Sequence, residues 1–307
     1  MIHANELVHG VFWDQPENPR AALRVQDAAG GFRDVELDAG TRLGFRISVP
    51  GKHCLGHHRV HGPAERDHIP CPRNAHAERG NQCGPCFAAD DSRLIHDFHR
   101  GGRVPPPGLR AYLMQPHWLY VASFAHGATK VGTASALRKW HRLAEQGAVA
   151  ARYIARTDDG RIVRLLEDLV TRDAGLPQQI RSAAKAAGLA DPRPAAEMDA
   201  RNAEEAQRAR ALLSVAGGDG YEVVDEPWTR PALADLACGH SPRHPYPHPL
   251  DADAHGFTIR SLSGGIALAG LMDNGPEFVV NLGDLKGRLL ETGEHHSEVP
   301  AVQESLF

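Results

Sequence analysis

Residues 118–132 read WLYVASFAHGATKVG and consist of two short runs joined by a turn. Trp118 to Phe124 is apolar and aromatic, Ala125-His126-Gly127 supplies a tight turn, and Ala128 to Gly132 is a second strand-like run. Short runs of this kind on either side of a glycine-containing turn are typical of a β-hairpin. We therefore predict two antiparallel strands here.

A helix and a third strand are predicted directly after the hairpin. Thr133 or Ser135 can cap a helix that runs to about Gln146, and Gly147 is a typical stop. Val149 to Ala155 then reads as a strand.

A second helix follows this strand. Thr157-Asp158-Asp159-Gly160 can cap it. Its apolar residues recur with the spacing of one buried helical stripe, and they are Ile162, Leu165, Leu166, Leu169 and Val170. The centre of the chain therefore has the predicted order strand, turn, strand, helix, strand, helix.

Four of the five cysteines lie close together, between residues 54 and 86. In a reducing compartment such clustering favours a metal over disulfides. Cys83-Gly84-Pro85-Cys86 is a knuckle in which both thiolates can reach one ion at about 2.3 Å. Cys54 and Cys71 are the economical second pair, which gives a closed structural zinc site with four cysteine ligands. Because Lys52 to Arg103 has few apolar residues, metal binding would supply much of its folding free energy.

Other interpretations of this segment remain open. A histidine could replace one sulfur, and the candidates are His57, His58, His61 and His76. Unligated thiols or a redox CxxC are alternatives, although no thioredoxin-like strand precedes the motif. A catalytic zinc is less favoured because four cysteines suffice to close the site. Cys238 lacks a partner at useful spacing and is interpreted as a solitary thiol.

Strand-like runs also occupy both ends of the chain. Arg42 to Val49 alternates apolar and polar residues, and Phe257 to Ile259 and Glu277 to Asn281 lie in a tail that is β-rich from Tyr221 onward. We expect the two ends to pair in one sheet or barrel, with the middle of the chain as an insertion.

The predicted fold class is α+β, in four parts. Residues 1–50 together with 221–301 are expected to form the β-rich domain, and residues 51–104 the zinc-binding segment. The central module is expected at 109–190. The alanine- and charge-rich residues 191–220 are expected to form a helical connector.

Composition excludes several classes of protein. The chain has 307 residues with 31 glycines and 22 prolines, which excludes long regular helix throughout. No stretch approaches the roughly 20 apolar residues of a membrane span, so we expect no membrane partner. The first twenty residues lack the pattern of a secretory leader, so we expect a cytoplasmic protein. The net charge of −4 argues against a uniformly basic nucleic-acid binder, but residues 92–172 hold 13 Lys and Arg against 6 Asp and Glu.

The central module resembles a known nuclease family. Leu119-Tyr120-Val121 and Lys130-Val131-Gly132 take the places of two strand motifs, Arg138 lies six residues beyond the glycine, and Glu167 ends a Leu-Leu-Glu on the next helix. This set resembles the GIY-YIG module of bacterial excision-repair nucleases, over about eighty residues near 110–190.

The resemblance implies roles for three of these residues. Glu167 would hold a catalytic Mg²⁺ or Mn²⁺, because hydrolysis of a phosphodiester needs a metal to polarise the phosphoryl oxygen. Arg138 would clamp the phosphate where the transition state becomes more anionic. Tyr120 would be the candidate base, and it would need a nearby cation to ionise from a pKa of about 10.

Other positions extend the candidate site or depart from the family pattern. Arg142, one helical turn after the proposed clamp, and His141 are candidates for contact with substrate. Lys130 replaces the tyrosine of the second motif and could contact phosphate. Gln178 and Gln179 stand where the family has an asparagine.

The whole chain also resembles the family called domain of unknown function 2797. The shared features are an early cysteine group that ends in CxxC, a Lys-Val-Gly strand, a helix that ends in Gln146-Gly147-Ala148, and a glycine-rich β tail from Gly265 to Gly287. The family name implies no activity, and a shared fold alone does not establish chemistry.

The leading hypothesis is a nucleic-acid-binding, GIY-YIG-like endonuclease with a structural zinc and a catalytic divalent ion, acting on DNA or RNA. A first alternative keeps the fold without the reaction, as a zinc-containing adaptor that binds nucleic acid. A second alternative is an enzyme that acts on a small molecule in the same cleft.

Overall fold

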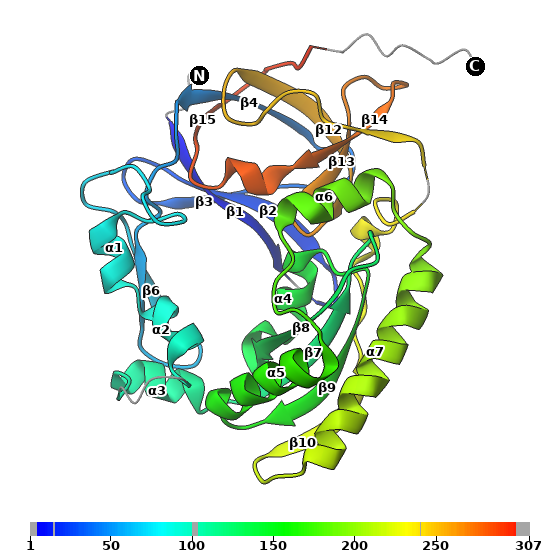
Figure 1. The fold of residues 1–307 in the computed structure, drawn as a ribbon. Helices are drawn as coiled ribbons and strands as arrows, with labels where there is room; N and C mark the ends of the chain where they lie inside the picture. The colour runs from blue at the N-terminus through cyan, green and yellow to red at the C-terminus, as the bar shows by residue number, and fades with distance from the viewer. Residues whose placement is uncertain (1–4, 15, 100–103, 240, 299–307) are drawn as a thin grey trace.

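The computed structural model describes residues 5–14, 16–99, 104–239 and 241–298. They form a mixed α+β fold with a nine-stranded sheet, a four-stranded sheet and one small hairpin (Figure 1). In Figure 1 the larger sheet lies above the smaller one and its helices, and the cysteine-rich segment, in cyan, lies to one side.

Strands from both ends of the chain share the nine-stranded sheet. Its order is β11-β14-β13-β12-β4-β15-β1-β2-β3, and β4 pairs with β12 on one side and with β15 on the other. Only β11 and β14 are parallel neighbours among these described strands. The strands are β1 (Glu6–Asp14), β2 (Arg20–Gln26), β3 (Phe32–Glu36), β4 (Arg42–Val49), β11 (Arg243–Pro245), β12 (Ala254–Ser263), β13 (Ile266–Gly270), β14 (Glu277–Asn281) and β15 (Leu289–Thr292).

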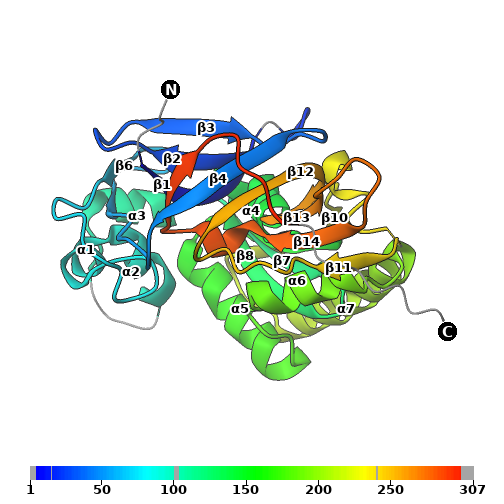
Figure 2. The same ribbon diagram turned by 90° about the horizontal axis from the view of Figure 1, so that it is seen from above.

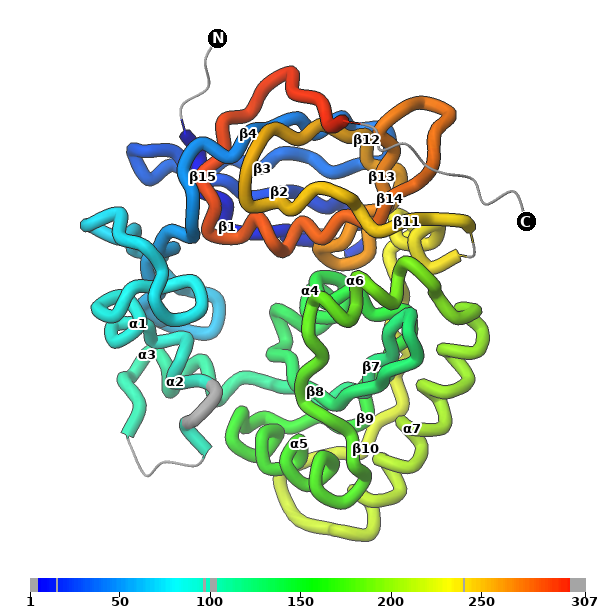
Figure 3. Tube along the Cα trace, turned by 45° about the horizontal axis from the view of Figure 1, so that its top comes forward, coloured from blue at the N-terminus to red at the C-terminus, as the bar shows by residue number. Residues whose placement is uncertain are grey.

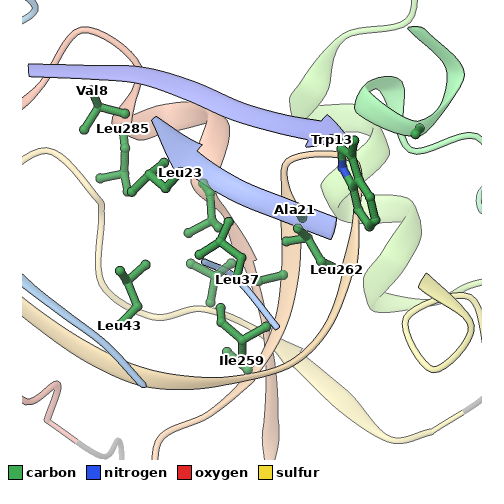
Figure 4. Close-up of a cluster of buried hydrophobic side chains, with 14 of the residues drawn as sticks. Val8, Trp13, Ala21, Leu23, Leu37, Leu43, Ile259, Leu262 and Leu285 are labelled. Atoms are coloured by element: carbon green, nitrogen blue, oxygen red, sulfur yellow. The ribbon is translucent and has the colours of Figure 1, made fainter. Parts of the chain in front are cut away.

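One face of this sheet is apolar because successive residues of a strand point to opposite faces. Leu43, Phe45 and Ile47 of β4 are all buried, whereas Arg46 between them is exposed. Figure 4 shows Leu43 gathered with Leu23 of β2 and with apolar residues of β12 in one cluster. The alternation predicted from the sequence therefore forms the core of the larger sheet.

The four-stranded sheet has the order β10-β9-β7-β8, and α4 joins β8 to β9. Leu119 and Val121 of β7 pack on the side of α5 and α7, whereas Tyr120 and Ala122 enter the core that this sheet shares with the larger one. Figures 2 and 3 show α7 along the outer side of the smaller sheet. The elements are β7 (His117–Ser123), β8 (Thr129–Ser135), η1 (Ala136–Arg138), α4 (Lys139–Gln146), β9 (Ala150–Thr157), α5 (Gly160–Ala174), α6 (Ser182–Ala190), α7 (Ala195–Ala216) and β10 (Tyr221–Pro227).

The cysteine-rich segment has its own small interior. The four cysteines are its buried cluster, and Ala75 is the partly buried residue packed against them. Its elements are β5 (His57–Val60), β6 (Arg66–Ile69), α1 (Gly84–Ala89) and α2 (Asp91–Asp97), and the helix that follows, α3 (Pro107–Leu113), packs against α2 and β5. The segment has few other buried apolar residues. Val60 of β5 is one, and Leu109 and Leu113 of the adjoining α3 are also buried.

Two expected boundaries differ from the structure. Strand β10, which the sequence analysis assigned to the sheet of the chain ends, pairs with β9 in the smaller sheet. The expected start of the central module at residue 109 falls inside a helix, because Pro107 begins α3, and a proline fits the first turn of a helix. Residues 100–103 lie outside the described ranges.

The buried face of α5 also differs from the predicted stripe. Val163, Leu166 and Val170 are buried, whereas Leu165 is 56% exposed. Glu167 shares the buried face. The helix is rotated by about one residue from the predicted phase, and this rotation turns the carboxylate inward.

No helix in the described ranges is both long and apolar enough to cross a membrane.

Candidate functional site

A hairpin and a knuckle bring the four cysteines together. Antiparallel pairing of β5 with β6 places the residues on either side of the hairpin, Cys54 and Cys71, next to each other. Cys83 precedes the first turn of α1 and Cys86 lies within it. All four Sγ atoms lie within 4.8 Å of one another, and all four side chains are buried.

The geometry of these sulfurs suits a tetrahedral metal ion. Zinc–sulfur bonds of about 2.3 Å give sulfur–sulfur separations of about 3.8 Å in a tetrahedron, and the Sγ atoms of Cys71 and Cys83 are 3.9 Å apart. The backbone N–H of Cys83 donates to the Sγ of Cys54 at 3.1 Å, as does that of Gly56 at 3.4 Å. Such donors stabilise thiolate ligands. The four cysteines could therefore hold a metal ion such as zinc.

Histidine is not needed to complete this set. The cysteines form the one group of three or more closely spaced metal donors among the described residues. His61 lies 3.0 Å from the Oδ2 of Asp67, and the ring of His76 lies 4.7 Å from that of His53. The fifth cysteine, Cys238, is buried in a different apolar cluster.

A pocket of about 420 Å³ lies in the central module, where five elements and the loop before α6 meet. Its volume is within the range of about 300–1,000 Å³ found for ligand sites. The lining residues that bear on its chemistry are His99, Tyr120, Lys130, Gly132, Arg142, Gln146, Arg164, Glu167, Asp168, Gln178, Arg181 and Lys185.

Positive charge dominates this pocket. The cations in the lining are Lys130, Arg142, Arg164, Arg181 and Lys185, and the carboxylates are Glu167 and Asp168. An excess of cations in a concave site raises the local concentration of anions. The pocket is therefore suited to an anionic ligand such as a phosphate group.

Tyr120 lies at the wall of the pocket because its strand partner is a glycine. Tyr120 pairs with Gly132 across β7 and β8. The phenol is fully buried, and its hydroxyl accepts a hydrogen bond from the Nε2 of Gln146 at 2.8 Å. Burial raises the pKa of Tyr120, although the charge of Arg142 acts in the opposite direction. The phenol therefore stays protonated at neutral pH.

The two carboxylates come from consecutive positions of α5. Glu167 is 4% exposed and accepts a hydrogen bond from the Nη1 of Arg164 at 2.7 Å. Asp168 accepts one from the Nε2 of Gln178 at 2.8 Å, and its other oxygen lies 3.3 Å from the Nε2 of His99. Both carboxylates thus already have protein partners.

Two lysines that line the pocket are partly neutral near pH 7. Burial lowers the pKa of Lys130 to about 8, and Arg142 adds to this effect while Glu167 opposes it. Burial also lowers the pKa of Lys185 to about 7, with further contributions from Lys130 and Arg142. The amines donate to backbone carbonyls, that of Lys130 to Gln178 at 3.2 Å and that of Lys185 to Gln146 at 2.9 Å.

The structure separates the residues that the sequence analysis grouped. Those that line the pocket are Tyr120, Lys130, Arg142 and Glu167. Arg138 instead donates to Glu145 at 2.5 Å and lines a different pocket. His141 lies 3.8 Å from Asp14 and faces away from these residues, in a groove beside Trp140.

Arg142 therefore occupies the place that the sequence analysis gave to Arg138. The helix was expected to start at residue 133 or 135, but β8 continues to Ser135 and the next three residues form a 3₁₀ turn. The change in residues per turn shifts the phase of the helix that follows. Sequence reasoning also missed Lys185, because α6 consists mainly of alanine and shows no amphipathic pattern.

Replacing Gly132 by alanine is expected to destabilise the protein and obstruct the pocket. The added Cβ would lie 2.5 Å from the Tyr120 hydroxyl and 2.6 Å from its Cζ. Because the ring is fully buried, it cannot move aside freely, and overpacking of this kind costs about 1–3 kcal/mol. Thermal unfolding measures the effect. Gly265→Ala is the control, since its nearest neighbour would be 3.8 Å away; equal stability of the two variants would contradict the prediction.

Comparison with known proteins connects this pocket to one family. Residues 98–223 match the model of the family described as "Protein of unknown function (DUF2797)". Every lining residue of the pocket, from His99 to Lys185, falls within this span, whereas the four cysteines precede it. Neither the curated proteins nor the solved structures include a match to the chain.

Proposed function

We propose that the pocket in the span matched by DUF2797 binds the phosphodiester backbone of a nucleic acid and hydrolyses it in the manner of a GIY-YIG nuclease, with a divalent ion. The observation that carries this proposal is the convergence of Tyr120, Lys130, Arg142 and Glu167 on one pocket. They come from β7, β8, α4 and α5. Tyr120, Lys130 and Glu167 are positions of the resemblance, whereas Arg142 lines the pocket in place of Arg138, to which the resemblance gave the phosphate.

Substrate binding would depend on the cations. Arg142 is exposed and can reach a phosphate as it enters, whereas Lys130 is 6% exposed and can contact only a group held inside. Contacts of this kind to phosphate are charge-assisted hydrogen bonds, which are about twice as strong as neutral ones. These residues would hold the phosphate and stabilise the charge that develops in the transition state.

The carboxylates fit a divalent ion in chemical type. Glu167 and Asp168 supply oxygen donors, which magnesium and manganese prefer, and phosphate oxygens and waters would complete the coordination. When bound, such an ion polarises a phosphoryl oxygen and lowers the pKa of its water. Glu167 would have to exchange its contact with Arg164 for the ion.

The proton acceptor in this proposal is Lys130 rather than Tyr120. Burial raises the pKa of Tyr120, so its hydroxyl is suited to donating a hydrogen bond to a phosphate oxygen. Lys130 has a pKa of about 8, so part of it is neutral near physiological pH and can accept a proton from water.

Cleavage of labelled single- and double-stranded DNA and RNA with magnesium or manganese tests the proposal. Glu167→Gln is expected to lower the rate by at least about a hundredfold, while Arg172→Gln should cleave normally, since Arg172 is an exposed cation that pairs with its neighbour Asp173. Equal cleavage by wild type and Glu167→Gln would refute the assignment.

Binding without hydrolysis is the second candidate function. The Arg164–Glu167 ion pair favours it, because it occupies the carboxylate that the divalent ion would need. This candidate predicts an affinity for nucleic acid that falls steeply with salt, because each phosphate contact releases counterions, and no cleavage product with any divalent ion.

Affinity for a phosphodiester is expected to fall as the pH rises from about 6 to about 9. Protonated lysines bind the anion, and Lys185 and Lys130 lose their protons near pH 7 and 8 respectively. The other charged or titratable groups that face this pocket are His99, Tyr120, Arg142, Arg164, Arg181, Glu167 and Asp168. The charge of a phosphodiester does not change in this range. Loss of two charge-assisted contacts should weaken binding by at least about tenfold. Fluorescence anisotropy with a labelled oligonucleotide measures the effect.

The control is Lys185→Arg, which keeps the positive charge throughout and should flatten the part of the profile near pH 7. An affinity that is constant with pH in wild type would contradict the assignment of these lysines to the ligand.

A further inference from the structure

We propose that a second pocket, of about 710 Å³, binds a nucleotide by its flat ring and its phosphate together. This pocket lies where β1 to β3 face the cysteine-rich segment and the start of α4. Its chemistry differs from that of the first pocket, because aromatic rings and cations are interleaved around it. None of its residues takes part in the proposed hydrolysis.

The aromatic side of the pocket is formed by Phe32, His9 and His68. Phe32 is 46% exposed, although it is a large apolar residue on a strand. Its ring centroid lies 4.9 Å from that of His9 and 5.1 Å from that of His68, in edge-to-face arrangements. These three rings meet edge to face, and the Cζ of Arg24 lies 6.0 Å from the centroid of Phe32, so the exposed part of the Phe32 ring is the aromatic surface open to a flat ligand.

A fixed guanidinium group adds a second flat surface. Arg24 lies over the ring of Phe12 with its Cζ 4.7 Å from the ring centroid. Two hydrogen bonds to Asp34, of 2.8 and 2.7 Å, hold it in that orientation. Nucleobases stack on guanidinium planes as well as on aromatic rings.

His68 also presents a hydrogen-bond acceptor that has no partner. Its Nε2 lies 2.6 Å from the carbonyl oxygen of Leu55, which can only accept, so Nε2 carries the proton. Its Nδ1 is buried and has no hydrogen-bond partner in the described part of the chain. A buried acceptor left unpaired costs free energy. The amino group of a base is a donor that could satisfy it.

Cations that could hold a phosphate lie in the same pocket. Arg66, Arg79 and Lys286 line it, and no carboxylate pairs with them among the described residues, whereas Arg138 is paired with Glu145. The carboxylate in the lining is that of Asp90, and it accepts the backbone N–H of His58 at 2.9 Å. A phosphate alone would not use the rings, and a neutral ring compound would not use the cations. A ligand that carries both groups uses the whole pocket.

The ligand could be a free nucleotide or an unpaired nucleotide within a strand. The two pockets are joined by η1 and α4, since Arg138, the last residue of η1, lines the second pocket and Arg142 and Gln146 of α4 line the first. A strand held by the first pocket could therefore place a neighbouring base in the second. The inference does not depend on hydrolysis, because it rests on the second pocket alone.

Calorimetric titration of the full chain with adenosine monophosphate, adenosine, inorganic phosphate and a short single-stranded oligonucleotide tests the proposal. We expect the nucleotide or the oligonucleotide to bind more tightly than adenosine or phosphate. Phe32→Leu keeps an apolar side chain without the flat ring and should weaken that binding about tenfold or more, since stacking of a base contributes about 1–3 kcal/mol. Arg66→Gln should weaken it and make it less dependent on salt.

Two controls separate this site from the first. Arg20→Gln removes an exposed cation of the same sheet that lies outside the pocket and pairs with Glu36, and it should bind as wild type does. Lys130→Met removes a cation of the first pocket, and the fold-loss of affinity caused by Phe32→Leu should be the same with and without it. Tight binding of the mononucleotide that Phe32→Leu weakens identifies a free nucleotide as the ligand, and tight binding of the oligonucleotide alone that Phe32→Leu weakens identifies a strand. The proposal is overturned if Phe32→Leu binds every probe as wild type does, or if no probe binds better than phosphate.

Discussion

Replacing Cys83 by serine is expected to abolish metal binding and to unfold the cysteine-rich segment, residues 53–97, while the two larger sheets stay folded. The physical reason is that the buried apolar residues of this segment are the four cysteines and Val60, with Ala75 partly buried against the cysteines. Without a metal, its two four-residue strands and its short helices would have little apolar burial to offset the loss of conformational entropy. Structural zinc contributes about 10–16 kcal/mol in small domains of this kind, so the loss should be complete.

Hydrogen exchange and the metal content of the purified protein measure this result. Amides of β5 and β6 should lose protection in Cys83→Ser and in chelator-treated wild type, whereas amides of β4 and β7 should keep theirs. Cys238→Ser is the matched control, because this thiol is equally buried but lies in another cluster. It should retain one metal ion per chain. Protection of β5 in metal-free protein would show that the segment folds without an ion.

The knuckle could be predicted from the sequence because its two thiols are close along the chain. The pairing of Cys54 with Cys71 was the economical choice, but nothing local required it. The hairpin that produces it could not be predicted, because β5 (HHRV) and β6 (RDHI) show no apolar alternation. The cysteine residues therefore predicted that these segments come together, whereas the hydrophobic pattern did not.

The hairpin of the central module was predictable because both of its faces are covered. Residues of β7 are buried on the α5 side and on the side of the larger sheet, which explains the continuous apolar run from Trp118. The phase of α5 was less predictable, since Leu165 fits the apolar spacing as well as Val163 does. Only packing against β8 and α7 decides that Glu167 turns inward.

The pairing of strand β10 could not be predicted from its amino-acid composition. Tyr221 begins a strand that resembles those of the tail in composition. The strand pairs with β9 because α7 packs along the smaller sheet and brings the chain back to the edge of β9. A residue pattern predicts that a strand forms but does not specify its neighbour. The pairing of the two chain ends was inferred only from their common β character.

Replacing Glu167 by glutamine is expected to lower the free energy of unfolding by roughly 3 kcal/mol, because breaking a buried ion pair leaves an uncompensated charge. The glutamine has nearly the shape of the glutamate, but Arg164 then lacks the carboxylate to which it donates, and Glu167 no longer offsets the charges of Lys130 and Arg142. The effect arises from electrostatics rather than from a cavity. Binding of a phosphodiester should meanwhile become tighter, since the pocket loses one of its two carboxylates.

A double-mutant cycle with Arg164→Gln distinguishes this electrostatic cause from a general loss of packing. If the buried charge is responsible, the cost of Glu167→Gln should be smaller in the Arg164→Gln background, with a coupling of about 0.5–3 kcal/mol. Urea unfolding followed by tryptophan fluorescence gives the four values, because Trp118 and Trp140 lie in the same module. Equal costs in the two backgrounds would show that Arg164 does not stabilise Glu167. We expect Glu167→Gln to lose both stability and cleavage while its phosphodiester affinity is retained or raised. This combination is expected if the carboxylate balances the cations of the pocket and also takes part in the reaction.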